Sequence, residues 1–269
     1  MDHDREKYKQ ELIDLYKRVD DVLTRNGVAF FAAYGTCLGA MRDKGIIPWD
    51  DDIDIAVFRC DLEKALSVIN NEGDEVICGT DAALSCYPNL FGRAFNRIRT
   101  DSTLERRRAY LDIYAIDKAD DSKFIFILRG LLYSGLSRIL ERRNGVNKMR
   151  YSLHHALSDL LVFPFRLFSS SRILRLQRKI YLSAKGTRFV KFIGDGRHRY
   201  FSNDFASAKR VPFMDTTIPV PVGFDELLTC CYGDWRTPPP LEQRESNAFA
   251  GVQGGWNVNL PQDSDRMII

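Results

Sequence analysis

Four aspartates within five residues give the sequence its strongest chemical signal. Asp50, Asp51 and Asp52 lead into the alternating segment Ile53-Asp54-Ile55. Side chains alternate between the two faces of a strand, so Asp52 and Asp54 share one face while the isoleucines point into a core. Their Cα atoms would lie roughly 6.5 Å apart, a spacing that lets both carboxylates reach one hard cation. Mg²⁺ with phosphate oxygens is the expected guest, with Mn²⁺ as the alternative.

A solvated loop and an EF-hand are the alternatives to a metal site on this strand. Acidic runs are most often solvated loops, and three aspartates alone favour that view. An EF-hand fits poorly, because counting from Asp50 places Ile55 where the calcium loop needs glycine and Asp61 where it needs glutamate. Carboxylates crowded on one strand repel one another, which favours a bound cation. Asp50, one strand period before Asp52, is expected to act as a further ligand, directly or through water.

A phosphate site is predicted shortly before the acidic strand. Gly35 and Thr36 follow an apolar run, where a chain leaving a strand can present backbone N–H groups to a phosphate. Arg42 and Lys44 come next, and each is either a contact to phosphate charge or a solvated surface base. Trp49 then fixes the approach to the aspartates.

A second acidic strand is predicted at 110–116, where Asp112 stands alone among apolar side chains. A carboxylate in such a strand is seldom left buried and unpaired. Asp112 is therefore either the third carboxylate of the metal site, which we favour, or a structural hydrogen-bonding residue. In the strand expected at 90–97, Arg93 and Arg97 alternate toward one face. Arg97 is a candidate contact to the bound phosphate, and a solvated base is the alternative.

Helices and strands must hold these side chains in place. An amphipathic helix is predicted over 4–25, with Asn26-Gly27 as its C-cap. Near the C-terminus lies Tyr232–Pro240, a loop made rigid by three prolines. This loop either places Tyr232 and Asp234 near a nucleotide or only closes the fold. The other predicted elements are helices at 38–42, 61–70 and 225–230, strands at 28–34, 75–79 and 90–97, and an extended run at 213–223.

Length and composition limit the size of the core and the class of protein. The chain has 269 residues, 45% of them hydrophobic, enough for one sizeable core with an appended subdomain. No signal peptide is recognisable, and no apolar run reaches the roughly 20 residues needed to span a bilayer. The six cysteines have no CxxC spacing, so neither a zinc site nor a disulfide framework is expected. We therefore expect a cytoplasmic protein, with a peripheral position on the inner face of the membrane as an option.

Charge is unevenly distributed along the chain. Residues 123–199 contain 17 Lys and Arg but three Asp and Glu, whereas the whole chain has a net charge of +3. Apolar stretches interrupted by bases favour a helical subdomain packed on the core. The alternative is a surface that rests on anionic lipid headgroups, with Arg142, Arg143, Arg175 and Arg178 as the charges to test. No RNA-binding signature accompanies these bases, so nucleic acid is not an expected partner.

The segment from Tyr34 to Val57 resembles the signature of the LicD family, which includes bacterial phosphocholine transferases and, more distantly, fukutin-related protein. The family pattern runs Tyr-Gly-Thr-Leu-Leu-Gly-Ala-Val-Arg and then Lys-Gly-Phe-Ile-Pro-Trp-Asp-Asp-Asp-Ile-Asp, with Cys37 and Met41 as mild apolar departures. Tyr232–Pro240 is similar to the family's Tyr-Gly-Asp-Tyr-Met-Thr-Pro-Pro. Family members often have a histidine shortly after this loop; here Arg244-Glu245-Ser246-Asn247 follows, so a role for that histidine does not transfer.

The resemblance covers about residues 5–117 and 211–244, and it implies an α+β, nucleotidyltransferase-like fold. Such a fold has a mixed β-sheet core flanked by helices, here with a basic helical insertion. We accordingly divide the chain into a catalytic core (1–117), a basic helical insertion (118–210), a C-terminal return to the core (211–249) and a flexible tail (250–269).

The resemblance further implies an enzyme that transfers a phospho-alcohol, phosphocholine above all. The donor would be CDP-activated, and the acceptor a hydroxyl group of a cell-surface glycan or its lipid-linked precursor. Asp52, Asp54 and Asp112 would hold one or two Mg²⁺ ions, Gly35 and Thr36 would hold the donor phosphates, and Asp112 is the expected acceptor of the hydroxyl proton. Two alternatives remain: a true nucleotidyltransferase that uses a nucleoside triphosphate, and a non-catalytic relative that binds glycan or membrane.

Overall fold

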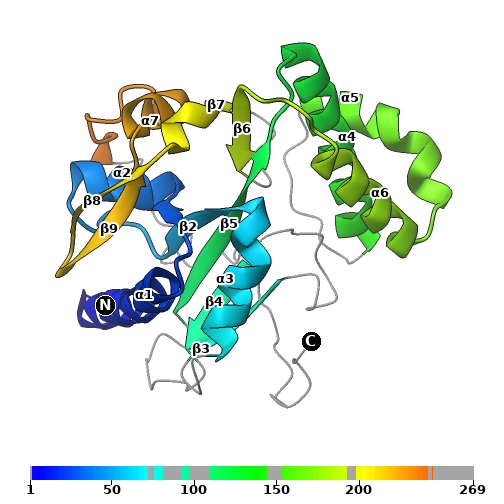
Figure 1. Ribbon diagram of the computed structural model, residues 1–269. Helices are drawn as coiled ribbons and strands as arrows, with labels where there is room; N and C mark the ends of the chain where they lie inside the picture. Colours follow the sequence, from blue (N-terminus) through cyan, green and yellow to red (C-terminus); the bar gives the residue numbers. More distant parts are fainter. Residues whose placement is uncertain are drawn as a thin grey trace.

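The computed structural model describes residues 2–71, 76–80, 92–96, 109–143, 153–192, 198–241 and 244. Within these ranges the protein is built around one mixed seven-stranded sheet, flanked by helices on one side and extended by a helical unit at one end (Figure 1). The α+β class expected from the sequence, a mixed sheet with helices packed on it, is confirmed. The strands of the sheet are β1 (Phe30–Ala32), β2 (Ile53–Phe58), β3 (Val76–Thr80), β4 (Gly92–Asn96), β5 (Tyr110–Lys118), β6 (Phe189–Phe192) and β7 (Tyr200–Phe201).

Strand β5 organises the sheet. It pairs in parallel with β2 along one edge, and antiparallel with β4 and then with β6 along the other. The register places Asp54 of β2 beside Asp112 of β5, and Arg93 of β4 beside the same Asp112. The strands thereby bring together three charged residues that lie far apart in the sequence.

Helices α1 (Asp2–Arg25) and α3 (Arg59–Asn71) pack against each other and against the sheet. Their apolar stripes, spaced by three and four residues, face the core as the periodicity predicts. Helix α1 ends where Gly27 adopts a φ of +63°, a left-handed conformation that favours glycine. The buried stripes consist of Leu12, Leu15, Tyr16, Val19, Val22 and Leu23 in α1, and of Leu62, Ala65, Leu66 and Ile69 in α3.

Helix α2 (Tyr34–Arg42) begins four residues earlier than the sequence predicts, and β1 is correspondingly shorter. The chain turns at Tyr34, whose φ is +42°, directly after the extended Ala33. Gly35 and Thr36 therefore lie in the first turn of a helix rather than in a loop before it. The first N–H groups of a helix have no intrahelical acceptor, so this position still suits an anion.

The C-terminal part returns to the core as a hairpin, a helix and the proline-rich loop. Strands β8 (Ala208–Phe213) and β9 (Thr216–Pro221) form a two-stranded antiparallel sheet against β1 and α2. Helix α7 (Phe224–Tyr232) follows and contacts α2. It ends at Gly233, where a φ of +69° directs the chain into Asp234–Pro240.

Most of the basic middle segment is helical. Helices α4 (Lys123–Arg143), α5 (Leu153–Val162) and α6 (Ser170–Leu182), with the 3-10 helix η1 (Phe163–Leu167), surround a small core of their own. Two strands that the sequence analysis does not predict, β6 and β7, then rejoin the main sheet. No helix in the described part of the chain is both long and apolar enough to cross a bilayer.

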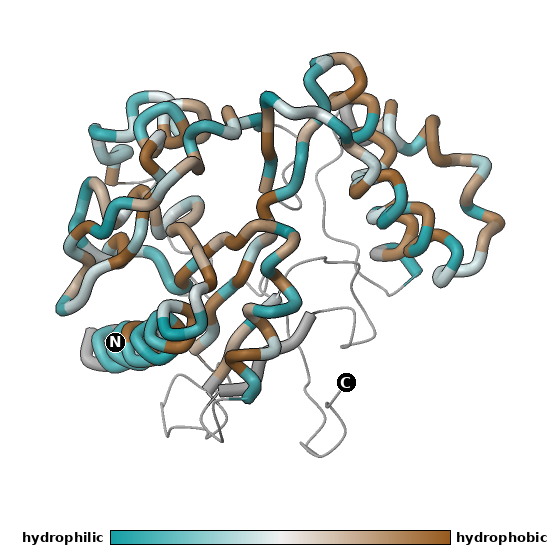
Figure 2. The backbone as a smooth tube through the Cα atoms, viewed as in Figure 1, coloured by the Kyte–Doolittle hydropathy of each residue, from teal (hydrophilic) through white to brown (hydrophobic). Residues whose placement is uncertain are grey.

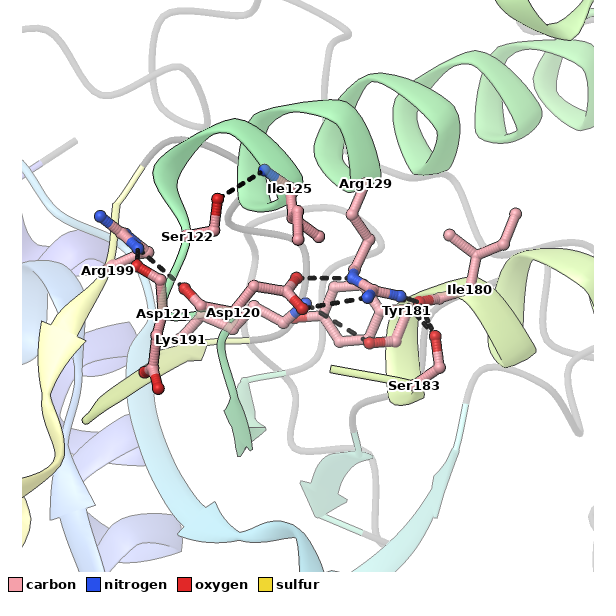
Figure 3. Close-up of polar contacts among 10 residues, drawn as sticks. All are labelled: Asp120, Asp121, Ser122, Ile125, Arg129, Ile180, Tyr181, Ser183, Lys191 and Arg199. Atoms are coloured by element: carbon pink, nitrogen blue, oxygen red, sulfur yellow. Dashed lines mark hydrogen bonds and ion pairs between the residues drawn. The ribbon is translucent and has the colours of Figure 1, made fainter. Parts of the chain in front are cut away.

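A polar network joins this helical unit to the sheet (Figure 3). Arg129 of α4 donates to both carboxylate oxygens of Asp120, at 2.7 and 3.0 Å, and also to the Ile180 carbonyl and the Ser183 hydroxyl at the end of α6. Arg199 donates to the backbone carbonyls of Asp120 and Asp121. The end of β5, the start of α4 and the end of α6 are thus tied at one point.

Candidate functional site

A cavity of about 750 Å³ opens beside the ends of β2 and α2 and is closed by the proline-rich loop. Its volume is typical of sites for small organic ligands. Eight of the residues expected to act in the site line it, together with Trp235 and Thr237–Pro240 of the proline-rich loop, and with Leu38 and Ile47, which the sequence analysis did not single out. The eight are Gly35, Arg42, Trp49, Asp50, Asp52, Asp54, Tyr232 and Asp234.

Asp54 forms the buried floor of the site. Its backbone is fixed on both sides: its N–H donates to the Thr36 hydroxyl at 2.8 Å, and its carbonyl accepts from the Ala33 N–H at 3.0 Å. Only 8% of the residue is exposed, and within the described chain its Oδ1 has no hydrogen-bond partner. A buried carboxylate oxygen without a donor is costly, so Oδ1 is the atom most in need of a cation or a proton.

The neighbouring carboxylates crowd one another. One oxygen from each of Asp50, Asp51 and Asp52 lies within 4.8 Å of the other two. Burial, and then the other carboxylates, raise the pKa of Asp50 to about 6 and the pKa of Asp52 to about 8. The same two causes raise the pKa of Asp54 well above its ordinary value. A divalent cation would relieve both the crowding and the unpaired Oδ1, so the donor set fits a hard metal ion.

Asp112 lies beside this group but in a different environment. Arg93 donates to both of its carboxylate oxygens, at 2.5 and 2.8 Å, and the Arg93 guanidinium lies 4.2 Å from the centroid of the Tyr110 ring. Asp112 does not line the cavity. The structure therefore shows the hydrogen-bonded role that the sequence left open, while the role of Asp112 as a third metal ligand stays a prediction.

The absence of a side chain at Gly35 makes room for the Asp50 carboxylate. A Cβ on Gly35 would lie 2.6 Å from Oδ2 of Asp50, well inside contact distance. The first turn of α2 and the acidic run therefore touch directly. Any phosphate bound at these N–H groups would lie next to the carboxylate cluster, which again favours a cation between them.

Cationic side chains surround Trp49 at the rim. The guanidinium carbons of Arg42 and Arg244 lie 5.6 and 5.3 Å from the centroid of a Trp49 ring. Arg42 also pairs with Asp43 at 2.8 Å, and Arg244 donates to the Pro239 carbonyl at 2.7 Å. Arg244 stands near the position where family members often have a histidine, and it ties the end of the proline-rich loop to Trp49.

The proline-rich loop lines the cavity as well as closing the fold. Asp234 accepts a hydrogen bond from the Thr237 hydroxyl at 2.7 Å, which fixes the turn before the three prolines. The Trp235 indole N–H donates to Asp225 at 3.0 Å. Burial and the nearby anionic groups raise the pKa of the Tyr232 hydroxyl, so this hydroxyl stays a hydrogen-bond donor.

Two expected contacts are not part of the cavity as described. Lys44 is exposed, has a φ of +57°, and its carbonyl accepts from the Met214 N–H at 2.8 Å, so in this structure it contributes to backbone packing. Arg97 lies outside the described residues, as does the tail at 250–269. Thr36 is buried and does not line the cavity, but its hydroxyl accepts the hydrogen bond from the Asp54 N–H.

Lys9 is a participant that sequence reasoning missed. It is 9% exposed, donates from Nζ to the Pro48 carbonyl at 3.0 Å, and its charge lowers the pKa of Asp50. Its position on α1, 41 residues before Asp50, gives no local signal. A polar residue next to Tyr8 on the buried side of α1 is the only hint in the sequence.

Comparisons with known proteins agree with this geometry. Residues 27–125 match the family model described as LicD/FKTN/FKRP, nucleotidyltransferase domain. The lipopolysaccharide cholinephosphotransferase LicD of Haemophilus influenzae is 26% identical over 239 residues, covering 82% of this chain and 87% of that protein.

Two uncharacterised rickettsial proteins are also similar. The protein of Rickettsia prowazekii is 30% identical over 118 residues and that of Rickettsia typhi 43% identical over 56 residues, which cover 43% and 21% of this chain. The matches span 36% and 18% of the lengths of those relatives. The resemblance to the LicD family stated from the sequence is thereby confirmed, together with the nucleotidyltransferase-like fold that the family model names. The matched stretch, residues 27–125, includes α2, β2 and β5.

Proposed function

We propose that the protein transfers a phospho-alcohol, phosphocholine in the first instance, from a CDP-activated donor to a hydroxyl group of a cell-surface glycan or its lipid-linked precursor. The observation that supports this most directly is the buried, unpaired Oδ1 of Asp54 beside three crowded carboxylates at the edge of a cavity of about 750 Å³. The name of the Haemophilus influenzae relative supports the choice of phosphocholine.

The proposed reaction is a displacement at phosphorus. The acceptor hydroxyl oxygen forms a new bond to the phosphorus that bears the alcohol, the bond from this phosphorus to the diphosphate bridging oxygen breaks, and CMP leaves. The hydroxyl proton passes to a carboxylate. Asp52 is better placed for this than Asp112, because it lines the cavity, whereas both carboxylate oxygens of Asp112 accept hydrogen bonds from Arg93.

Asp52 and Asp54, with help from Asp50, would hold Mg²⁺ or Mn²⁺. When bound, such an ion neutralises charge on the diphosphate and orients the reacting oxygens. The chain's own groups act around it: the first turn of α2 presents N–H groups, Thr36 fixes Asp54, and Arg42 and Arg244 supply positive charge at the rim. Because guanidinium groups already lie over Trp49 and over Trp235, Tyr232 is the better aromatic contact for the alcohol.

The test is product analysis with defined donors. CDP-choline, Mg²⁺ and a glycan acceptor should yield CMP and phosphocholine-bearing glycan in stoichiometric amounts. Asp54→Asn should reduce the rate at least tenfold, about 1.4 kcal/mol of transition-state stabilisation. Asp215→Asn, at an exposed surface pair with Lys17, is the matched control and should not change it. Formation of CDP-choline from CTP and phosphocholine would instead identify a nucleotidyltransferase, and Mg²⁺-dependent binding without turnover a non-catalytic relative.

A further inference from the structure

The helical unit has an exposed apolar band that the proposed function does not use. Leu157, Leu160 and Leu161 are spaced as one face of α5, opposite Ser158 and Val162, which are buried against α4. Leu160 is 73% exposed. The band continues through Phe163, Leu167 and Phe168, and Leu167 is 94% exposed. Large apolar side chains gathered in one place, rather than scattered singly, indicate a surface that meets another apolar phase.

The band occupies one extremity of the molecule. In Figure 1, α5 and the connection to α6 form the edge opposite α2 and α7, whose residues line the cavity. Figure 2 shows hydrophobic colouring along this edge next to hydrophilic segments of α6. The apolar band is therefore separate from the candidate active site. It lies at the periphery of the molecule, where an extended surface such as a membrane can contact it.

Exposed bases border the band. The outer face of α6 presents Arg172, Arg175, Arg178 and Lys179, while Ile173, Gln177 and Tyr181 form its buried face. Arg166, in η1, lies with its guanidinium carbon 5.2 Å from the centroid of the Phe163 ring. The only acid in 153–182 is Asp159, which is already paired with Arg138 and Arg142. The border is thus uniformly positive.

We propose that this surface, the apolar band of α5 and η1 together with the basic face of α6, docks on a bilayer that presents anionic lipid headgroups. Apolar side chains inserted at the level of the headgroups, with Lys and Arg beside them, are the pattern of an interfacial helix. A second copy of this chain fits less well, because two uniformly basic borders would face each other. The proposal does not depend on the transferase activity, since its readout is binding to vesicles.

The contacts of each arginine identify the charges that can be reversed without disturbing the fold. Arg142 pairs with Asp159 at 2.9 Å, and Arg143 donates to the Arg166 carbonyl and the Ser170 hydroxyl. Reversing either charge would disturb packing within the helical unit. Arg172, Arg175 and Arg178 are exposed on the outer face of α6, so they are the charges to reverse.

The experiment is vesicle flotation of the full chain with phosphatidylcholine alone or mixed with phosphatidylglycerol. Wild type should bind only the mixed vesicles and less at high salt. Leu160→Ser/Leu167→Ser and, separately, Arg172→Glu/Arg175→Glu/Arg178→Glu should each lower the partition coefficient at least about tenfold. Matched controls with exposed residues elsewhere, Val222→Ser/Leu241→Ser and Lys118→Glu/Lys209→Glu, should bind as wild type does.

Three outcomes would overturn the proposal. They are equal binding to both kinds of vesicle, binding unchanged in the two surface variants, and a concentration-dependent dimer that the Leu160→Ser/Leu167→Ser change dissolves in analytical ultracentrifugation. Far-ultraviolet circular dichroism checks that each variant is folded, and Leu167→Ser alone provides a version with the least effect on packing, because its side chain is almost fully exposed.

Discussion

At the scale of single residues, the crowded carboxylates of the acidic cluster work against stability when they are ionised and no cation is bound. Asp50, Asp52 and Asp54 are all buried enough for their pKa values to rise, and each raises those of the others. Lys9 and Arg93 lower them only in part. Groups held in an unfavourable ionisation state in this way are typical of sites where charge is used for binding or catalysis.

The first prediction concerns the pH dependence of the metal-free protein. The folded-state pKa of Asp52, about 8, lies above the ordinary value of 3.8, so the folded state binds this proton more tightly than the unfolded state does. The resulting stabilisation is complete below the unfolded pKa and is lost as the pH rises through the folded pKa. We expect Tm in EDTA to fall between about pH 4 and pH 8, and Asp52→Asn to flatten this slope.

Thermal unfolding across this pH range measures the effect, with Asp215→Asn as the control at an exposed position. Added Mg²⁺ should act in the opposite direction, raising Tm more at pH 8 than at pH 5, because carboxylates must lose their protons to bind a cation. Parallel pH profiles for Asp52→Asn and wild type would show that the Asp52 proton is not linked to folding.

The second prediction separates Asp112 from the other carboxylates. Arg93 and Asp112 are 11% and 5% exposed in their side chains and form a two-point ion pair. Removing one partner of a buried pair leaves the other charge uncompensated and typically destabilises a protein by about 3–5 kcal/mol. Asp112→Asn should therefore lower Tm, whereas Asp52→Asn should raise it at neutral pH in EDTA.

The double variant Arg93→Gln/Asp112→Asn is the control for this pair, because it removes both charges. We expect it to recover a large part of the lost stability, as measured by urea unfolding. If Asp112→Asn alone is as stable as wild type, the ion pair is not an important part of the fold, and a role of Asp112 in binding metal gains weight.

At the scale of elements, α2 determines the position of the acidic run. Its first turn approaches Asp50 so closely that a side chain at position 35 must displace the Asp50 carboxylate, and the Thr36 hydroxyl in the same turn accepts from the Asp54 N–H. Helix α2 therefore contacts both Asp50 and Asp54. The glycine and the aspartates act as one unit for this reason, despite the 14 residues between Gly35 and Asp50.

The third prediction tests this contact with Gly35→Ala. Alanine inside a helix is favoured over glycine by about 1 kcal/mol, so any loss cannot come from helix propensity. The new Cβ must displace the Asp50 carboxylate, and we expect the Tm increase on adding Mg²⁺ to shrink and the transfer rate to fall at least tenfold, about 1.4 kcal/mol. Gly27→Ala is the matched control: its φ of +63° makes alanine unfavourable by about 1 kcal/mol, and its Cβ would meet open space.

Gly27→Ala should thus lower Tm without changing the response to Mg²⁺, and Gly35→Ala should do the reverse. Equal responses to Mg²⁺ in Gly35→Ala and wild type would show that the cluster tolerates a shift of Asp50, or that it does not bind the ion.

Local patterns predicted the main helices and strands of the core, but neither the junctions between them nor the short strands β6 and β7. The stripes of α1 and α3 and the alternation in β2 depend on neighbouring residues, and the structure has these elements where the periodicity predicts them. The early start of α2 was missed because it depends on one left-handed residue, Tyr34, a conformation that few non-glycine residues adopt and that no local pattern announces.

Contacts made by distant residues were also missed. The pairing of Arg93 with Asp112 follows from the register of β4 on β5, and the position of Lys9 follows from the packing of α1. Both contacts depend on the tertiary structure and cannot be predicted from local patterns in a single sequence. The cavity-lining residues Leu38 and Ile47 carry no chemical signal of their own, so only the arrangement of the elements reveals them.

At the scale of the whole molecule, two aspartates at the end of β5 engage basic side chains. Arg129 pairs with Asp120, and the charges of Asp117 and Asp120 act on Lys191, whose pKa burial lowers to about 8. Asp117 also accepts two hydrogen bonds from Arg59 of α3, at 2.8 and 2.6 Å. Asp117 and Asp120 flank the end of β5. Part of the positive charge of the middle segment is thus used inside the protein, which leaves the outer face of α6 as the basic surface available to a partner.

The last prediction concerns the junction at Arg129. The side chain is 16% exposed and holds Asp120, the Ile180 carbonyl and Ser183 at once (Figure 3). Arg129→Met leaves the Asp120 carboxylate buried without this partner, which we expect to destabilise the protein by about 3 kcal/mol or more. Amide hydrogen exchange should speed up in α4 and α6 while β2 and α3 stay protected, because the lost bonds tie the helical unit to the sheet.

Arg175→Met is the matched control, since Arg175 is exposed on the same unit and a surface substitution usually changes stability by less than about 0.5 kcal/mol. Uniformly faster exchange throughout the chain in Arg129→Met would mean that the helical unit and the sheet unfold as one. Exchange confined to α4 and α6 would mean that the unit opens separately. In that case the helical unit, with its basic surface, opens without unfolding β2, the strand that carries Asp54.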